Sequence, residues 1–219
     1  MKYDQIRASL LSIKLIPNVT DAMKEKLDLP EGHRSIGVFT ADCDDVAYIA
    51  MDEATKKANV KGVYGETHYA GAANATGALA GEVICVISGP TPAEVKSGLQ
   101  TIVDVFDAED APHFVSCNDD DSIAYMAYTV SKTGSYLSGL ANIPEGEAIT
   151  YMIAYPCEFH YALDAAMKAA EVELCLYIAP PSPTNCGGAF LTGTQSACQT
   201  ACEAFGQAVQ YVADHPLEF

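Results

Sequence analysis

The chain has 219 residues, of which 49% are hydrophobic, and no stretch approaches the roughly 18 unbroken apolar residues of a membrane-spanning helix. Its formal net charge of −17, with only 12 Lys and Arg residues, excludes a general nucleic-acid-binding role, because phosphate contacts require clustered cations. Eight scattered cysteines, several of them inside apolar strand-like runs, are typical of reduced thiols in a cytosolic protein.

The first half of the chain predicts alternating strands and helices. Residues rich in β-branched and aromatic side chains predict strands at 12–17, 35–40, 60–64 and 82–87. Apolar residues at helical spacing predict a helix between the second and third strands, on Ala47, Ala50, Met51, Ala54 and Ala58. A final helix is expected from Thr91 and Pro92, and the acidic segment 107–112 is expected to link the two halves.

The second half predicts the same order of elements. Strands are expected at 113–116, 148–154, 172–177 and 189–192, with a helix on Tyr161, Ala165, Ala169 and Val172 and a last helix from Thr194 to Phe205. The acidic run 118–121 is expected to cap a helix. Each half therefore reads as a mixed α/β domain.

An internal repeat explains this parallel. The pattern D-x-A-x-K-x-A-x-V occurs at 52–60 and again 112 residues later (164 − 52) at 164–172. Two further pairs support the repeat: 30–32 matches 144–146 at an offset of 114, and 88–93 matches 192–197 at an offset of 104. Because the offset falls from 112 to 104 between residues 60 and 88, the first copy has eight extra residues, which we place in the Gly- and Ala-rich loop 67–80. We expect two domains, at residues 1–108 and 109–219.

Vicinal carboxylates mark one candidate site. Asp42, Asp44 and Asp45 follow a predicted strand and open a helix, where they could simply cap that helix. Alternatively, they could neutralise an ammonium group, with Glu82 brought close at the start of a neighbouring strand. The spacing indicates no metal cage.

Other constellations carry less chemistry. Cys157, Glu158 and His160 lie within four positions, which leaves open a cysteine-dependent enzyme or a zinc contact beside an ordinary helix entry. The sequence contains no GxSxG elbow and no phosphate-binding loop, so we expect neither an enzyme nor a bound cofactor.

Finer motifs reveal a resemblance. They are Ala41–Val46, Asp52–Lys56, Tyr69–Ala73, Ala80–Val83, Thr133–Ser138 and Ala189–Gly193. Together they resemble the bacterial microcompartment shell domain in its tandem form, the shell proteins of ethanolamine-utilisation compartments. The resemblance covers the entire chain. It implies a circularly permuted shell fold of α+β, ferredoxin-like type, present twice.

The resemblance also implies assembly and a pore. A homotrimer of two-domain chains would tile like a hexamer among other shell proteins of a cytoplasmic microcompartment. The loop 67–80 would gate a central pore for metabolites. The gate residues would be Thr67, His68, Tyr69, Ala70 and Gly71, with Tyr69 as the plug.

An ethanolamine pocket is the third implication. Its ligands would correspond to Asp44, Asp45, Glu82, Phe114, Thr184, Asn185 and Cys186. An ammonium group requires ionised acceptors, which the three acidic residues supply, while a hydroxyl requires neutral groups such as Thr184. The main alternative is a cytosolic metabolite-binding regulatory protein that has the same ferredoxin-like topology but forms no shell. No metal is assigned, and zinc near Glu158 or His160 stays open.

Overall fold

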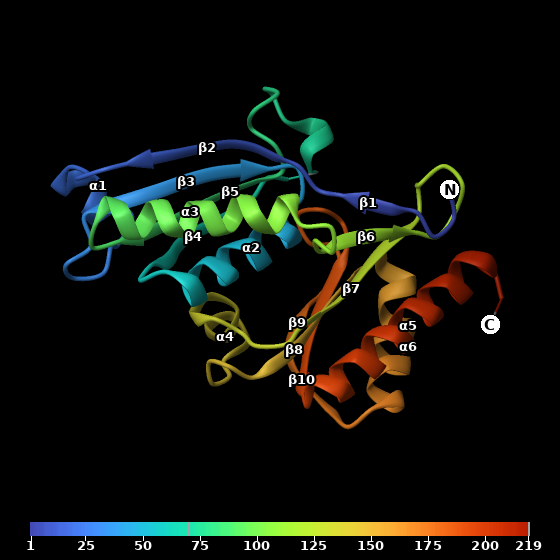
Figure 1. The fold of residues 1–219 in the computed structure, drawn as a ribbon. Helices are drawn as coiled ribbons and strands as arrows, with labels where there is room; N and C mark the ends of the chain where they lie inside the picture. The colour runs from blue at the N-terminus through green and yellow to red at the C-terminus, as the bar shows by residue number, and fades with distance from the viewer. Residues whose placement is uncertain (70, 219) are drawn as a thin grey trace. The chain divides into compact units, whose positions relative to one another are not determined.

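A computed structural model describes residues 1–69 and 71–218 of the chain (Figure 1). The chain forms two compact units that do not strictly follow sequence order. The first-repeat unit comprises residues 8–111 together with 134–137, and the second-repeat unit comprises residues 1–7, 112–133 and 138 onward. The boundary expected between residues 108 and 109 concerns the sequence repeat and stays a prediction.

An antiparallel sheet of order β2-β3-β5-β4 forms the first-repeat unit. Its strands are β2 (Leu10–Ile16), β3 (Ser35–Ala41), β4 (Lys61–Thr67) and β5 (Val83–Gly89). On β3, Gly37 lies against Leu99 of helix α3 (Pro92–Asp107), whereas Ile36 packs with Val19 and Val86 on the opposite face. This alternation follows from the two-residue period of a strand.

The helices of this unit are α1 (Asp21–Lys26), α2 (Asp44–Lys57), the short 3₁₀ helix η1 (Ala72–Asn74) and α3. Fully buried alanines at positions 47, 50 and 54 allow α2 to approach α3 and the sheet closely. Helix α3 begins with Pro92 after Thr91, whose hydroxyl accepts a hydrogen bond from the backbone N–H of Glu94.

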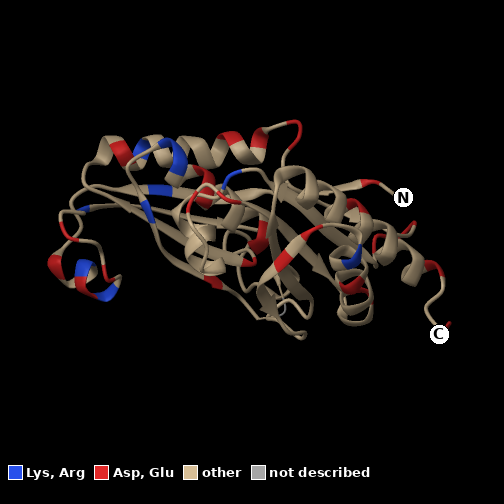
Figure 2. Cartoon of the chain, turned by 90° about the horizontal axis from the view of Figure 1, so that it is seen from below, with Lys and Arg blue, Asp and Glu red and all other residues tan. Residues whose placement is uncertain are grey.

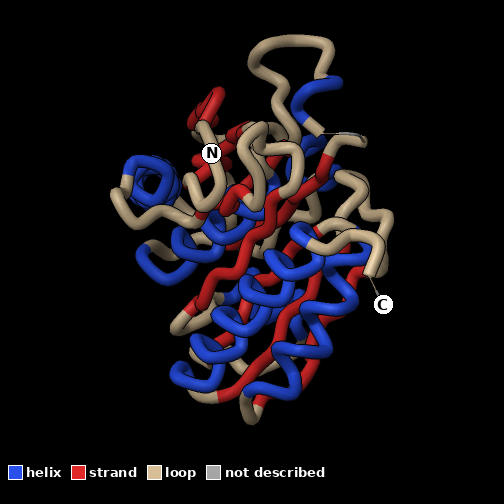
Figure 3. The backbone as a smooth tube through the Cα atoms, turned by 90° about the vertical axis from the view of Figure 1, so that its right-hand side faces the viewer, coloured by secondary structure: helices blue, strands red, loops and turns tan. Residues whose placement is uncertain are grey.

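The second-repeat unit contains a six-stranded sheet of order β1-β6-β7-β8-β10-β9. Its strands are β1 (Gln5–Arg7), β6 (His113–Ser116), β7 (Ala124–Val130), β8 (Ala148–Ala154), β9 (Val172–Ile178) and β10 (Gly187–Gly193). Its helices are α5 (Pro156–Ala169) and α6 (Gln195–Asp214), which pack against each other, and the second part of α4 (Ser135–Ala141), whose first three residues belong to the first-repeat unit. Figure 3 shows helices laid against strands, and Phe159, Phe205 and Met152 lie in the core between them.

The two units repeat one architecture. Helices α2 and α5 each have 14 residues, and their first residues are 112 apart (156 − 44). Strands β4 and β9 pair with β5 and β10 through the same irregularity, which skips Val63 in one copy and Cys175 in the other. The prediction of two tandem α+β domains that share one architecture is therefore confirmed.

Two details of the sequence prediction were wrong. Strands β1 and β7 were not predicted, and the segment 118–121 does not open a helix but forms the turn between β6 and β7. In this turn the Asn118 side chain accepts a hydrogen bond from the backbone N–H of Ile123, and Asp121 has a φ of 58°. Asn and Asp favour such turns as much as helix caps, which explains the error.

Charge and hydropathy agree with the composition. Figure 2 shows the positions of Asp and Glu residues distributed along the backbone of the chain, with fewer Lys and Arg positions between them. Among the residues described, none of the helices combines the length and apolarity that crossing a bilayer requires.

A buried carboxylate secures the segment 134–137 in the first-repeat unit. Asp52 on α2 is fully buried, and its two oxygens accept hydrogen bonds from the backbone N–H groups of Gly134 (2.7 Å) and Leu137 (2.8 Å). The ammonium group of Lys56 lies 3.4 Å from the same carboxylate. Because charge-assisted hydrogen bonds in a dry environment are strong, this contact stabilises the start of α4.

We expect the Asp52→Ala variant to lose about 2–4 kcal/mol of unfolding free energy, because two buried N–H groups would lose their acceptor. Denaturant unfolding at a fixed protein concentration measures this change. The control is Asp104→Ala at an exposed position of α3, which should stay within about 0.5 kcal/mol of the parent. Equal stability of Asp52→Ala and the parent would show that the contact contributes nothing.

Candidate functional site

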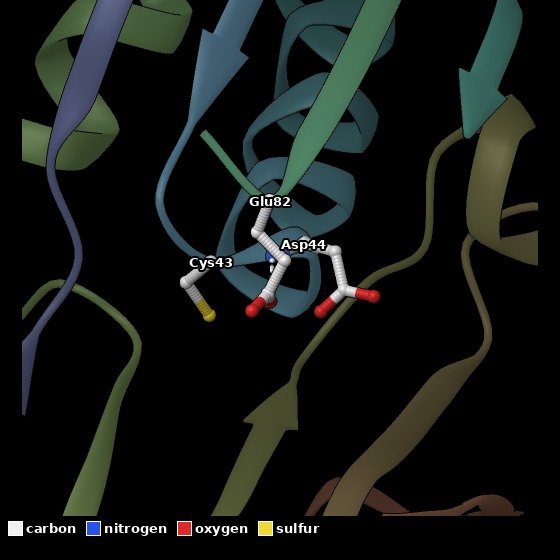
Figure 4. Close-up of side chains that lie close together, drawn as sticks. All are labelled: Cys43, Asp44 and Glu82. Carbon is white, nitrogen blue, oxygen red and sulfur yellow. Dashed lines mark hydrogen bonds between the residues drawn. The ribbon is translucent and has the colours of Figure 1, made fainter. Parts of the chain in front are cut away.

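Three acidic residues of the first-repeat unit, Asp44, Asp45 and Glu82, lie where α2 begins. Strand β3 ends at Ala41, which pairs with Val83 at the start of β5, so the preceding residue Glu82 is carried to the first turn of α2. Figure 4 shows Glu82 beside Asp44 and Cys43. Asp44 and Asp45 are both buried. The structure therefore places the carboxylate of Glu82 beside that of Asp44, while Asp45 follows Asp44 in the same helical turn.

Hydrogen bonds fix the orientation of the carboxylates. One oxygen of Glu82 accepts from the backbone N–H of Asp44 at 3.0 Å, and the carboxylate of Asp44 accepts from Asp45 N–H at 2.9 Å. The hydroxyl of Thr67 donates to the second oxygen of Asp44 at 2.6 Å and lies 2.8 Å from the hydroxyl of Tyr48. Thr67 and Tyr48 were not predicted as supports of this site, although Tyr48 lies one helical turn after Asp44.

The electrostatics of the cluster favour a cationic ligand. Burial, followed by the nearby charge of Asp44, raises the pKa of Glu82 to about 7. Hydrogen bonds from the backbone N–H groups of Asp44 and Ala72 act in the opposite direction. A cation placed here would relieve the repulsion between the carboxylates and favour the ionised form of Glu82.

The same cluster has a geometry that could hold a metal ion. One ligand atom each of Cys43, Asp44 and Glu82 lies within 4.8 Å of the others. A thiol binds metal as thiolate, yet burial and the charge of Asp45 raise the pKa of Cys43 well above its usual value. Because the thiol stays protonated, the carboxylates of Asp44 and Glu82 are the groups available to bind a cation, and carboxylates suit an ammonium ion.

The loop after β4 contacts this cluster. Glu82 accepts a hydrogen bond from the backbone N–H of Ala72, and the backbone carbonyl of Glu82 accepts from His68 N–H at 2.6 Å. Gly71 has a φ of +73°, and a Cβ at this position would lie 2.7 Å from the Glu82 carboxylate. Only glycine fits there without displacing the carboxylate.

The predicted gate is exposed at its centre. The side chain of Tyr69 is 81% exposed, while Ala70 lies outside the described residues. Beneath the loop is a hollow of about 350 Å³, lined by Leu11, Asp42, Ala72, Ala75, Thr76, Gly77, Ala78 and Gly81. The loop is therefore attached near Glu82 but loosely packed beyond it.

The remaining predicted ligands belong to the second-repeat unit. Thr184, Asn185 and Cys186 form a turn between β9 and β10, in which Ser182 N–H donates to the carbonyl of Cys186 at 3.0 Å. Phe114 lies on β6 and pairs with Ile6 of β1. The structure thus groups the predicted ligands into an acidic set in one unit and a neutral set in the other.

The constellation around Cys157 shows no dyad geometry. Cys157 is exposed in the first turn of α5. The two ring nitrogens of His160 lie 2.6 Å from the carbonyl of Pro156 and 2.9 Å from the hydroxyl of Tyr177. Both ring nitrogens of His160 therefore have hydrogen-bonding partners, one on α5 and one on β9, which hold the imidazole between these elements.

Comparison with known proteins gives full-length matches. Residues 35–116 match the family described as the BMC domain. The chain is 57% identical to the bacterial microcompartment shell protein EutL of Clostridium perfringens over the full length of both, and 47% identical to that of Salmonella typhimurium over 98% of this chain and 97% of the relative. The crystal structure of ethanolamine utilization protein EutL from Leptotrichia buccalis matches with a TM-score of 0.97 at 58% identity, covering both chains completely.

These matches discriminate between the classes considered from the sequence. The relatives are named as shell proteins, which favours a structural role over a cysteine-dependent enzyme. A regulatory protein that merely shares the topology is not favoured, because the identity extends over the whole chain. The chain belongs to the EutL family of bacterial microcompartment shell proteins.

Proposed function

We propose that this shell protein assembles as a homotrimer with a gated central pore and binds ethanolamine weakly at the acidic cluster. The trimer would lie among other shell proteins of an ethanolamine-utilisation microcompartment. The observation that carries the proposal is the half-buried carboxylate of Glu82, which is bonded both to the start of α2 and to the loop 67–80.

The duplicated fold supports the trimer. Two copies of one domain in each chain give six domains in three chains, an arrangement that can close into a ring with approximate six-fold symmetry. Fusion of the copies then allows one domain to differ from the other.

Ethanolamine suits the chemistry of the predicted ligands. Its ammonium group would bind Asp44, Asp45 and Glu82. The neutral groups of Phe114, Thr184, Asn185 and Cys186 are the proposed partners of its carbon atoms and hydroxyl. Four heavy atoms at about 1.5 kcal/mol each give a ceiling of roughly 6 kcal/mol, or a dissociation constant of tens of micromolar.

The loop 67–80 is the proposed gate. Because Glu82 accepts from Ala72 N–H, a cation bound at Glu82 would alter the electrostatic environment of the loop's own attachment point. A ligand can shift a two-state loop only by its differential affinity for the two states, so the effect of a weak ligand is at most a few kcal/mol. We expect ethanolamine to favour the closed state.

The trimer predicts a sedimentation coefficient for three chains of 23.2 kDa each at micromolar concentration. Sedimentation velocity over a concentration series measures this mass. A single species near the mass of one chain throughout the series would contradict the trimer.

Ethanolamine affinity should rise about tenfold from pH 6 to pH 8. With a pKa of about 7, Glu82 is mostly protonated at pH 6 and mostly ionised at pH 8, and only the carboxylate attracts the ammonium group. Ethanolamine keeps its proton in this range. Isothermal titration calorimetry at several pH values measures the effect, together with proton release at pH 6.

The matched control is Glu82→Gln, which keeps the shape but cannot ionise. Its affinity should be low and independent of pH over the same range. An unchanged affinity in Glu82→Gln, or the opposite pH dependence in the parent, would contradict the role of Glu82.

Removal of residues 72–79 should leave the fold of the sheet intact, because it changes no strand and no α-helix. The pore of this variant should remain open whether or not ethanolamine is present. Crystal structures of the parent and the variant test the state of the pore, and hydrogen exchange in the parent tests whether saturating ethanolamine protects the loop. An occluded pore in the variant, or exchange that ignores ethanolamine, would defeat the gate.

A further inference from the structure

Helices α1 and α4 are counterparts in the internal repeat, 114 residues apart (135 − 21). Their C-terminal turns show the same hydrogen bonds at this offset. Asp28 N–H donates to the carbonyl of Glu25 at 3.3 Å, and Asn142 N–H donates to that of Gly139 at 3.4 Å. Leu29 N–H and Ile143 N–H likewise donate to Lys24 and Ser138 at 3.0 and 3.1 Å. The two elements are therefore equivalent residue by residue.

The start of α4 is seated in the first-repeat unit on a surface formed by α2 and β4. Tyr136 stacks obliquely on Tyr48, with ring centroids 5.8 Å apart. A Cβ on Gly62 would lie 2.9 Å from the ring of Tyr136, and a Cβ on Gly65 would lie 2.8 Å from its hydroxyl. The two glycines thus provide the space that this tyrosine occupies.

The counterpart surface on α5 and β9 is uncovered. The repeat offset of 112 relates Asp52 to Asp164, Gly62 to Leu174 and Gly65 to Tyr177, in agreement with the paired strand registers. Asp52 is fully buried, whereas the side chain of Asp164 is 65% exposed, and Leu174 and Tyr177 are also exposed.

The counterpart element, α1, is uncovered as well. None of its residues is buried, and Met23 is 39% exposed while its counterpart Leu137 is fully buried. Each chain therefore leaves two counterpart surfaces exposed. One is the surface of α5 and β9, and the other is helix α1.

The large and small side chains have opposite positions in the pair that is in contact and in the pair that is uncovered. In the seated pair, the large residue Tyr136 lies on the helix and the glycines lie on the strand. In the uncovered pair, the helix carries Ala22 at the position of Tyr136, and the strand carries Leu174 and Tyr177 at the positions of the glycines. In both pairs one tyrosine thus meets smaller side chains, since Tyr136 meets the glycines and Tyr177 would meet Ala22, so a large side chain on one element is matched by small ones on the other.

We propose that α1 of one copy of this chain docks on the α5 and β9 surface of a second copy, with Ala22 facing Leu174 and Tyr177. Asp164 then faces residues 20–23 at the start of α1, as Asp52 faces residues 134–137. Because the contact joins two different surfaces, it is heterologous and propagates around a ring of chains. This inference rests on the proposed trimer and names its interface.

The test is a volume exchange by mutation, followed by sedimentation velocity. Ala22→Tyr should overfill the interface and raise the midpoint concentration for assembly by at least about tenfold. The Leu174→Gly, Tyr177→Gly double variant, which leaves a void, should also weaken assembly. Combining all three substitutions copies the arrangement of the first-repeat unit and should restore assembly. A double-mutant cycle then measures the coupling between the substitution on α1 and the substitutions on β9.

The matched control is Glu25→Tyr on the same helix. Its counterpart Gly139 has open space where a Cβ would lie, so this variant should assemble like the parent. Circular dichroism verifies that each variant is folded. If the glycine variants fail to fold, Asp164→Lys on the exposed face of α5 provides a second test and should dissociate the assembly.

The outcomes separate the interface from the trimer itself. A parent that is monomeric overturns the proposed trimer and this inference with it. A trimeric parent whose assembly is unaffected by Ala22→Tyr and Asp164→Lys overturns the interface alone. Loss of assembly in Ala22→Tyr but not in Glu25→Tyr, with recovery in the triple variant, supports the interface.

Discussion

The carboxylate of Glu82 connects the two parts of the first-repeat unit on which the proposed function depends. One oxygen accepts from the backbone N–H at the start of α2, and the same side chain accepts from Ala72 in the loop after β4. Burial of this group beside Asp44 is unfavourable for its charge, which is the reason for its raised pKa. A cationic ligand would stabilise the charged form at the place where helix and loop meet.

The two copies have the same backbone fold, but the residues at the position of the acidic cluster differ. At the repeat offset of 112, Asp44 and Asp45 correspond to Pro156 and Cys157, and at the later offset of 104 Glu82 corresponds to Cys186. Helix α5 therefore begins with a proline where α2 begins with carboxylates. The acidic cluster is a property of the first copy alone, although the sheet order β2-β3-β5-β4 returns as β7-β8-β10-β9.

Local patterns predicted the repeated elements and the acidic cluster, because both depend on short segments. The β-branched run before Asp42 and the strand after Glu82 are neighbours in an antiparallel sheet, which brings the carboxylates together. Strand β1 was missed because it has three residues, and its pairing with β6 lies more than 100 positions away. The role of Asp52 was equally hidden, since its partners Gly134 and Leu137 follow 82 and 85 positions later. No local pattern marks a contact of this kind.

Fusion of the copies gives a physical reason for their divergence. In a ring of six identical domains, every substitution appears six times, so a long loop or an acidic cluster would be present at every position. In the proposed trimer, each appears three times, and the eight extra residues of the first-copy loop have fewer neighbours to avoid near the axis. The same asymmetry permits Tyr136 to face glycines within the chain, whereas in the proposed interface Ala22 would face Leu174 and Tyr177 of another chain. Complementary volumes of this kind also disfavour wrong pairings, because a tyrosine against a tyrosine would clash and an alanine against glycines would leave a void.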